Sequence, residues 1–279
     1  MANHHYGRIG DIWKHLPLAE ILSIEKPAEY WESHAGSARY PLTHSWQRDY
    51  GVFYFLSHAA ESEALSASNY RKLLVECVNF YPGSSEIAMR VLGPDATYIL
   101  CDTDPESITS LRISAIELGI PQARCENADG NDLLWNEITH LSRERARQLF
   151  VHLDPWSCMT PSELNGRTSL DLFRELSRKG ASALLWVGFD SIDQRDAIVE
   201  QFDGGNWFGE IQLELIKNPR PELNPGVFGC GLCGANLNAR AVEAVERLGR
   251  ELACIYEAAV IAPGACGRLR YQSTRLHRA

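Results

Sequence analysis

Three acidic residues stand where apolar runs of the sequence end. Asp102 follows "TYILC", Asp129 follows "ARCENA" and Asp154 follows "LFVHL". A single acid in such a place is more often a helix cap or a turn former. If the runs are parallel strands, however, their carboxyl ends meet at one edge of the sheet, where α/β folds bind ligands. There one carboxylate can accept from both ribose hydroxyls and another from an adenine amine, so three acids in order favour a nucleoside-containing cofactor.

The segment "HAGSARY" at 34–40 indicates which cofactor this is. Its small residues let a ligand approach the backbone closely. It has a single glycine, and the chain contains no G-x-G-x-x-G that would cradle a pyrophosphate. S-adenosylmethionine (SAM), which has no phosphate, therefore fits this loop better than a dinucleotide does.

The predicted elements that position these acids alternate between strand and helix, which favours a parallel sheet covered on both faces. We expect strands, or strands with their following turns, at 28–40, 97–105, 123–130, 148–156 and 181–190, and a late antiparallel pair at 210–216 and 226–238. We expect helices at 13–25, 106–120, 169–180 and 239–258.

Residues 41–92 interrupt this alternation with helical patterns and a "YPGS" turn at 81–84. We interpret them as a helical subdomain inserted after the first strand. Residues 1–40 and 93–279 would then form one Rossmann-like domain that binds SAM.

The composition limits the classes of function. With 279 residues, of which 45% are hydrophobic and 23% charged, the chain can bury the core of one large α/β unit. The net charge of −9 argues against broad binding to nucleic acid. We expect the basic segments 143–148 and 267–279 to be a solvated helix face and a frayed end.

No apolar run reaches the roughly 18 residues that span a bilayer, and the first residues lack the apolar core of a signal peptide. We therefore expect a cytoplasmic protein with no membrane partner. Its eight cysteines should then be reduced thiols. Cys230 and Cys233 form a C-x-x-C without a second pair of ligands, so a buried strand is a better interpretation than a zinc site.

Six blocks, in order, resemble the RlmJ-type family of ribosomal RNA adenine-N6 methyltransferases. The blocks are "HYGRIGDIWKH" at 5–15, "SHAGSARYPL" at 33–42, "FYPGSSEIA" at 80–88, "CDTDP" at 101–105, "ENADG" at 126–130 and "HLDPWS" at 152–157. The resemblance covers most of the chain. It implies an α/β, Rossmann-like, class I SAM methyltransferase fold with SAM as cofactor.

The resemblance also implies roles for single residues. Lys14, His34 and the loop around Gly36 would line the methionine end of SAM. Asp102 would take the ribose hydroxyls, and the Asp129–Gly130 pair the adenine amine. From the residues alone, Lys14 could equally be part of a polar helix face, and His34 a satisfied histidine at the end of a strand.

The chain departs from the family at its catalytic motif. Where the family has Asp-Pro-Pro-Tyr, this sequence has Asp154, Pro155, Trp156 and Ser157. The family's acid and first proline carbonyl accept hydrogen bonds from the target amine, and its tyrosine stacks on the flipped base. Asp154 and Pro155 are retained, but the aromatic residue moves by one position. The indole of Trp156 could hold the sulfonium by a cation–π contact of roughly 0.5–2 kcal/mol, or it could pack under the loop as core.

Four functions follow from these observations. The first is methyl transfer from SAM to an amine of a small molecule or a nucleotide, with tight binding to ribosomal RNA not expected. A second is a SAM cyclase or lyase that releases methylthioadenosine. A third is a non-catalytic SAM- or nucleoside-binding partner subunit, and the fourth is the family's own methylation of adenine in ribosomal RNA.

Overall fold

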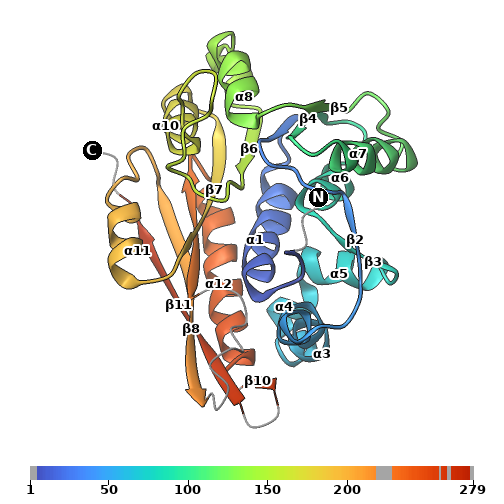
Figure 1. Ribbon diagram of the computed structural model, residues 1–279, viewed down its shortest axis with the longest axis vertical. Coiled ribbons are helices and arrows are strands. Elements are labelled where there is room, and N and C mark those ends of the chain that lie inside the picture. The colour runs from blue at the N-terminus through green and yellow to red at the C-terminus, as the bar shows by residue number, and fades with distance from the viewer. Residues whose placement is uncertain (1–4, 218–227, 258, 263–264, 277–279) are drawn as a thin grey trace.

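The computed structural model of the protein describes residues 5–217, 228–257, 259–262 and 265–276. Within these residues one large sheet has the strand order β10-β11-β8-β9-β7-β6-β1-β4-β5 (Figure 1). Its strands are β1 (Glu29–Glu32), β4 (Thr97–Asp102), β5 (Arg124–Asn127), β6 (Leu149–Leu153), β7 (Ser182–Phe189), β8 (Trp207–Lys217), β9 (Gly229–Ala235), β10 (Ala259–Ala262) and β11 (Ala265–Arg275). Strands β5, β4, β1, β6 and β7 run parallel, and the remaining four pair antiparallel. The predicted Rossmann-like α/β fold is confirmed.

Helices cover both faces of this sheet. They include α1 (Ile9–Glu25), α6 (Ser84–Leu92), α7 (Pro105–Glu117), α8 (Gly130–Thr139), α9 (Arg143–Ala146), α10 (Ser169–Lys179), α11 (Ile192–Val199) and α12 (Ala239–Ile255). Successive strand residues point to opposite faces. Phe150 therefore packs in the apolar cluster that contains α1 and α12, whereas Val151 packs in the cluster that contains α8 and α10.

The segment between β1 and β4 is mainly helical, as the sequence predicted. It comprises β2 (Arg39–Pro41), α2 (Trp46–Arg48), η1 (Asp49–Phe53), α3 (Tyr54–His58), η2 (Ala59–Glu61), α4 (Glu63–Ala67), α5 (Asn69–Glu76) and β3 (Phe80–Pro82), and α6 follows it. The short pair β2–β3 was not predicted. Tyr50, Phe55 and Tyr70 share one apolar cluster with Trp13 of α1. The division into two domains stays a prediction.

The C-terminal tail corrects the sequence analysis. We expected 267–279 to be a frayed end, but β11 pairs with β8 from Cys266 to Arg275. The overlooked signal is the alternation of Leu269 and Tyr271 with arginines, which is the period of a strand. Arg268 and Arg270 both bind Glu214, so these basic residues are paired within the sheet.

Some predicted elements extend beyond the residues that the structure describes, at positions 226–227, 258 and 277–279. Segment 143–148 contains the short helix α9, where Arg145 binds Glu29 through both carboxylate oxygens. Within the described ranges, no helix has the length and apolarity needed to span a membrane.

Candidate functional site

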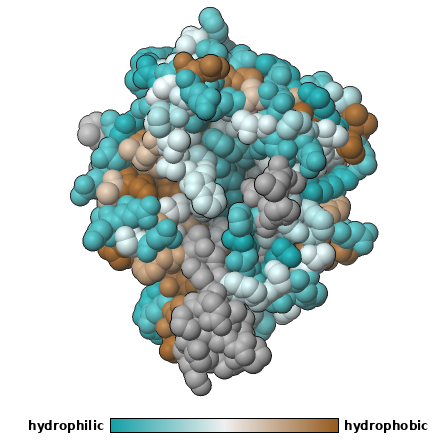
Figure 2. All heavy atoms as spheres, in the orientation of Figure 1, coloured by the Kyte–Doolittle hydropathy of each residue, from teal (hydrophilic) through white to brown (hydrophobic). Residues whose placement is uncertain are grey.

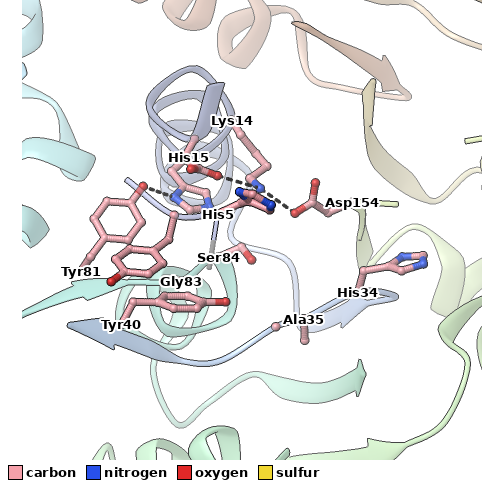
Figure 3. Close-up of a pocket in the computed structure, with 13 residues that line it drawn as sticks. His5, Lys14, His15, His34, Ala35, Tyr40, Tyr81, Gly83, Ser84 and Asp154 are labelled. Atoms are coloured by element: carbon pink, nitrogen blue, oxygen red, sulfur yellow. Dashed lines mark hydrogen bonds and ion pairs between the residues drawn. The ribbon is translucent and has the colours of Figure 1, made fainter. Parts of the chain in front are cut away.

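A small open cavity of about 40 Å³ lies at the carboxyl edge of the parallel strands (Figure 3). It is built by α1 and the residues just before it, the loop after β1, the pair β2–β3, the start of α6 and the residue that follows β6. Its lining consists of His5, Tyr6, Asp11, Lys14, His15, His34, Ala35, Gly36, Tyr40, Tyr81, Gly83, Ser84 and Asp154. Figure 2 shows that much of the surrounding face is hydrophilic. Four of the predicted site residues meet here, namely Lys14, His34, Gly36 and Asp154.

An ion-pair network joins α1 to the end of β6. The Lys14 Nζ atom lies 2.6 Å from Asp154 Oδ2 and 3.2 Å from Asp11 Oδ1. Burial opposes the charge of Lys14, but the carboxylates of Asp154 and Asp11 outweigh it and raise the pKa of Lys14 above its ordinary value. Lys14 is therefore an ammonium in the folded protein and holds one oxygen of Asp154. Its Nζ also lies 5.7 Å from the ring centroid of Trp186 in β7.

Asp102 is fixed by the loop that follows β1. Its Oδ2 accepts a hydrogen bond from Gly36 N at 2.8 Å, and its Oδ1 accepts one from Asp104 N at 2.8 Å. Gly36 has φ +57°, and a Cβ there would lie 2.5 Å from the hydroxyl oxygen of Tyr40. The loop thus requires glycine at this position. Asp102 itself lies outside the cavity lining.

Asp129 and Gly130 start helix α8. Asp129 Oδ1 accepts from Asn131 N at 2.8 Å and from Asp132 N at 3.2 Å, so this acid is a helix cap. A Cβ on Gly130 would lie 1.9 Å from the carbonyl oxygen of Ser33, so glycine permits close packing of α8 on the end of β1. Neither residue lines the cavity. Within the described part of the chain, Asp129 Oδ2 has no hydrogen-bond partner.

His34 lies on the opposite side of the cavity from His15 and points away from it (Figure 3). Ser33 Oγ lies 2.7 Å from its Nδ1. Burial lowers the pKa of His34, although Asp154, Asp129 and other acids oppose the shift. We infer that His34 is a neutral imidazole at neutral pH.

The aromatic residue of the altered motif is displayed to solvent. Trp156 is 90% exposed, so the alternative that it packs under the loop as core is wrong. It is absent from the cavity lining, and its ring centroid lies 6.2 Å from that of His5. Pro155 is buried beside it. Trp156 is therefore exposed to solvent and lies outside the residues that line the cavity.

Hydrogen bonds to α8 and α10 hold the loop that carries Trp156. Leu170 N donates to Cys158 O at 3.1 Å, and Ser162 Oγ donates to Asp132 Oδ1 at 2.7 Å. On the same loop Leu164 is 87% exposed.

Several lining residues were missed by the sequence analysis. His15 Nδ1 lies 2.8 Å from the Tyr81 hydroxyl, and burial lowers the pKa of His15 far below its ordinary value. Ser84 is buried and begins α6, which has no side-chain cap. Asp11 and His15 were visible inside the block "HYGRIGDIWKH", at helical spacing around Lys14, and Ser84 was visible in "YPGS". Their residue types alone gave no reason to assign them roles.

The C-x-x-C is not arranged as a metal site. Both cysteines lie in β9, but Cys230 packs in one apolar cluster and Cys233 in the other, on opposite faces of the sheet. Over the described ranges, no group of three or more potential metal-binding side chains occurs.

Sequence similarity to a known methyltransferase covers part of the chain. A tRNA (guanine-N(7)-)-methyltransferase of Saccharophagus degradans is 32% identical over 111 residues, which is 40% of this chain and 46% of that protein. The chain thus matches less than half the length of this curated relative. No protein-family model matches the chain.

Among solved structures, protein LPL1258 from Legionella pneumophila has a TM-score of 0.68 at 18% identity, covering 97% of this chain and 98% of that one. This similarity extends over the whole fold and concerns the fold alone. A SAM-dependent methyltransferase from Agrobacterium tumefaciens has a TM-score of 0.40 at 15% identity, covering 84% and 64% of the two chains, which is too distant to support any argument.

Proposed function

We propose that the protein is a SAM-dependent N-methyltransferase, a divergent relative of the RlmJ type, which acts on an amine of a small molecule or a nucleotide and not on intact ribosomal RNA. The observation that carries the proposal is the half-buried Asp154 at the sheet edge. Lys14 binds its Oδ2, while no described residue hydrogen-bonds its Oδ1. A fixed carboxylate with one free oxygen at a cavity is suited to accept a hydrogen bond from an amine.

The residues present suit SAM. Gly36, which carries no side chain because the Tyr40 hydroxyl lies against it, lines the cavity and presents its backbone to the methionine end. The start of α6 at Gly83 and Ser84, with Lys14 nearby, suits the methionine carboxylate, because helix N-termini favour anions. The lone pairs of Asp102 that are not used by Gly36 N and Asp104 N would accept hydrogen bonds from the ribose hydroxyls. Asp129 Oδ2 would accept one from the adenine amine.

When bound, SAM supplies a methyl group made electrophilic by its sulfonium. Asp154 Oδ1 would accept an N–H bond from the acceptor amine, with the Pro155 carbonyl as second acceptor, and so aim the nitrogen lone pair. Lys14 keeps Asp154 in place. Alignment of this kind provides about 7–11 kcal/mol when the reactants are well oriented.

The charges of the chain support a small acceptor. The net charge is −9, and the arginines of the C-terminal strand are paired with Glu214 and Glu246. Binding to a long RNA depends on many unpaired cations that replace counterions. The match to a tRNA methyltransferase supports methyl transfer, and its acceptor is not carried over to this chain.

Asp102→Ala should weaken SAM binding by about 1–3 kcal/mol, because hydrogen bonds to a charged group are lost. Calorimetric titration with SAM measures this. Asp104→Ala is the matched control, since Asp104 caps α7 two residues away and is not expected to touch the ribose. Equal losses in the two variants would contradict the ribose role, and no binding of SAM by the wild type would contradict the whole proposal.

Trp156→Ala should raise the KM for the acceptor and leave SAM affinity and folding near the wild-type values. The indole is exposed beside Asp154 and can stack on an acceptor, which is worth about 1–3 kcal/mol for a planar base. Leu164→Ala, at a similarly exposed position of the same loop, is the control. An unchanged KM in Trp156→Ala would exclude the indole from the acceptor site.

A further inference from the structure

Asp11 is the one acid of the cavity that has no part in the proposed reaction. It lies in the first turn of α1, and its two oxygens have different partners. Oδ2 accepts from Arg8 N at 3.1 Å, and Oδ1 lies 3.2 Å from Lys14 Nζ. Because the same ammonium lies 2.6 Å from Asp154 Oδ2, two carboxylates share one cation.

We infer that Asp11 is a positioning residue, which acts through Lys14 to fix the orientation of Asp154. The inference rests on the proposed function where it concerns methyl transfer. The geometry favours it because Lys14 is a long, flexible side chain that would otherwise have a single anchor. With Asp11 on one side and Asp154 on the other, the ammonium is held between α1 and the end of β6.

A helix cap alone does not account for Asp11. On α10, Asp171 occupies the same place in the first turn and accepts from Thr168 N at 3.0 Å. That bond corresponds to the bond between Arg8 N and Asp11. Asp171 also lies near a cation three residues on, with its Oδ1 3.9 Å from Arg174 Nη1, but neither residue lines the cavity. Asp11 differs because its cation, Lys14, also binds Asp154. Asp171 is therefore a control both for capping and for a local ion pair.

Several charged and titratable groups lie near Asp154. From α1, Lys14 binds it and also holds Asp11, and from β1 and its following loop Tyr30 and His34 interact with it. The buried Glu32 of β1 interacts with Tyr30 and His34 and binds His152 of β6 at 2.8 Å. Burial lowers the pKa of His34 and raises that of Tyr30, so both are neutral near pH 7.

Asp11 is thus the like charge that shares a cation with Asp154. Burial raises the pKa of Asp11, Lys14 opposes this, and Asp154 adds to it, as expected for two coupled acids. Removing the charge of Asp11 leaves Asp154 as the single carboxylate that holds the Lys14 ammonium, so the ammonium should become more mobile.

The test measures the order of the Lys14 side chain by NMR relaxation of its Cε–Nζ group, in protein labelled with ¹³C and ¹⁵N at lysine, with the resonance assigned by its loss in Lys14→Met. In Asp11→Asn the Lys14 ammonium should be less ordered than in the wild type, because one of its two carboxylate partners is lost. Asp171→Asn should leave the order of Lys14 unchanged. Asp11→Glu keeps a carboxylate and should keep the order near that of the wild type, and it also serves if Asp11→Asn does not fold.

The same variants are then assayed for S-adenosylhomocysteine formation. Asp11→Asn should lower kcat roughly 10-fold, within the range for a misplaced reacting group, and should leave the KM for SAM near the wild-type value. A Lys14 side chain that is as ordered in Asp11→Asn as in the wild type, or that loses order equally in Asp171→Asn, overturns the inference. The NMR measurement needs neither SAM nor turnover, so a wild type that fails to bind SAM contradicts the proposed function alone.

Discussion

Asp154→Asn should lower the rate of methyl transfer by about 10²-fold or more, the size expected for an orienting or proton-accepting group, while SAM still binds. In the variant the carbonyl oxygen of the introduced asparagine can take the place of Oδ2 on Lys14. Its amide NH₂ then faces the acceptor and donates where a hydrogen-bond acceptor is needed. The measurement is the steady-state rate of S-adenosylhomocysteine formation, together with SAM affinity by calorimetry.

Asp190→Asn is the matched control for this experiment. Asp190 directly follows β7, the strand beside β6, but it is exposed and absent from the cavity lining. It should retain the wild-type rate. A wild-type rate in Asp154→Asn would remove Asp154 from the reaction and favour a SAM-binding partner subunit.

Lys14→Met should lower the rate at neutral pH by about tenfold or more. The substitution leaves Asp11 and Asp154 facing each other without their shared cation. Without that cation Asp154 loses the partner that fixes its position, so it should no longer orient the acceptor amine. The measurement is the steady-state rate of S-adenosylhomocysteine formation, together with SAM affinity by calorimetry.

The stability of the same variant provides an independent measurement. The pKa of Lys14 is raised in the folded state, so the stability that its charge contributes is fully present below the ordinary lysine value of about 10.4. It is lost as the pH rises through the folded value. In Lys14→Met this alkaline loss of the unfolding free energy should be smaller.

Lys179→Met is the control for a half-buried lysine. Its ammonium donates to the carbonyl oxygens of Ile138 and Leu141, away from the cavity. This variant should lose stability and keep the wild-type rate. A wild-type rate in Lys14→Met would contradict the proposed role of the Lys14–Asp154 pair.

The sequence was informative where local pattern and position in the sheet agree. Apolar runs that end in Asp102 and Asp154 predicted strand ends, and parallel pairing brings those ends to one edge. The same rule was ambiguous for Asp129, because an acid before a helix is also a cap, and here it caps α8. From the local sequence alone, an acid that binds a ligand at the end of a strand looks the same as an acid that caps the helix that follows.

Other features depend on contacts between segments far apart in the chain. Trp156 could have been core, cofactor contact or surface, and only the packing of its loop on Asp132 and Leu170 decides that it is exposed. Pairing of Lys14 with Asp154 links residues 140 positions apart. The strand β11 was missed because net basicity was weighed above its alternating pattern.

The central claim is tested most directly by identifying the adenosine product that the purified protein makes from SAM. The protein is incubated with SAM alone, and with SAM plus an amine source, which is either AMP or the small-molecule fraction of a cell extract. The products are separated and identified by mass spectrometry. We predict S-adenosylhomocysteine, formed in proportion to a methylated amine and dependent on the acceptor. Methylthioadenosine from SAM alone would contradict the account and indicate a cyclase or lyase, and the absence of any product with every amine source would contradict an enzymatic function.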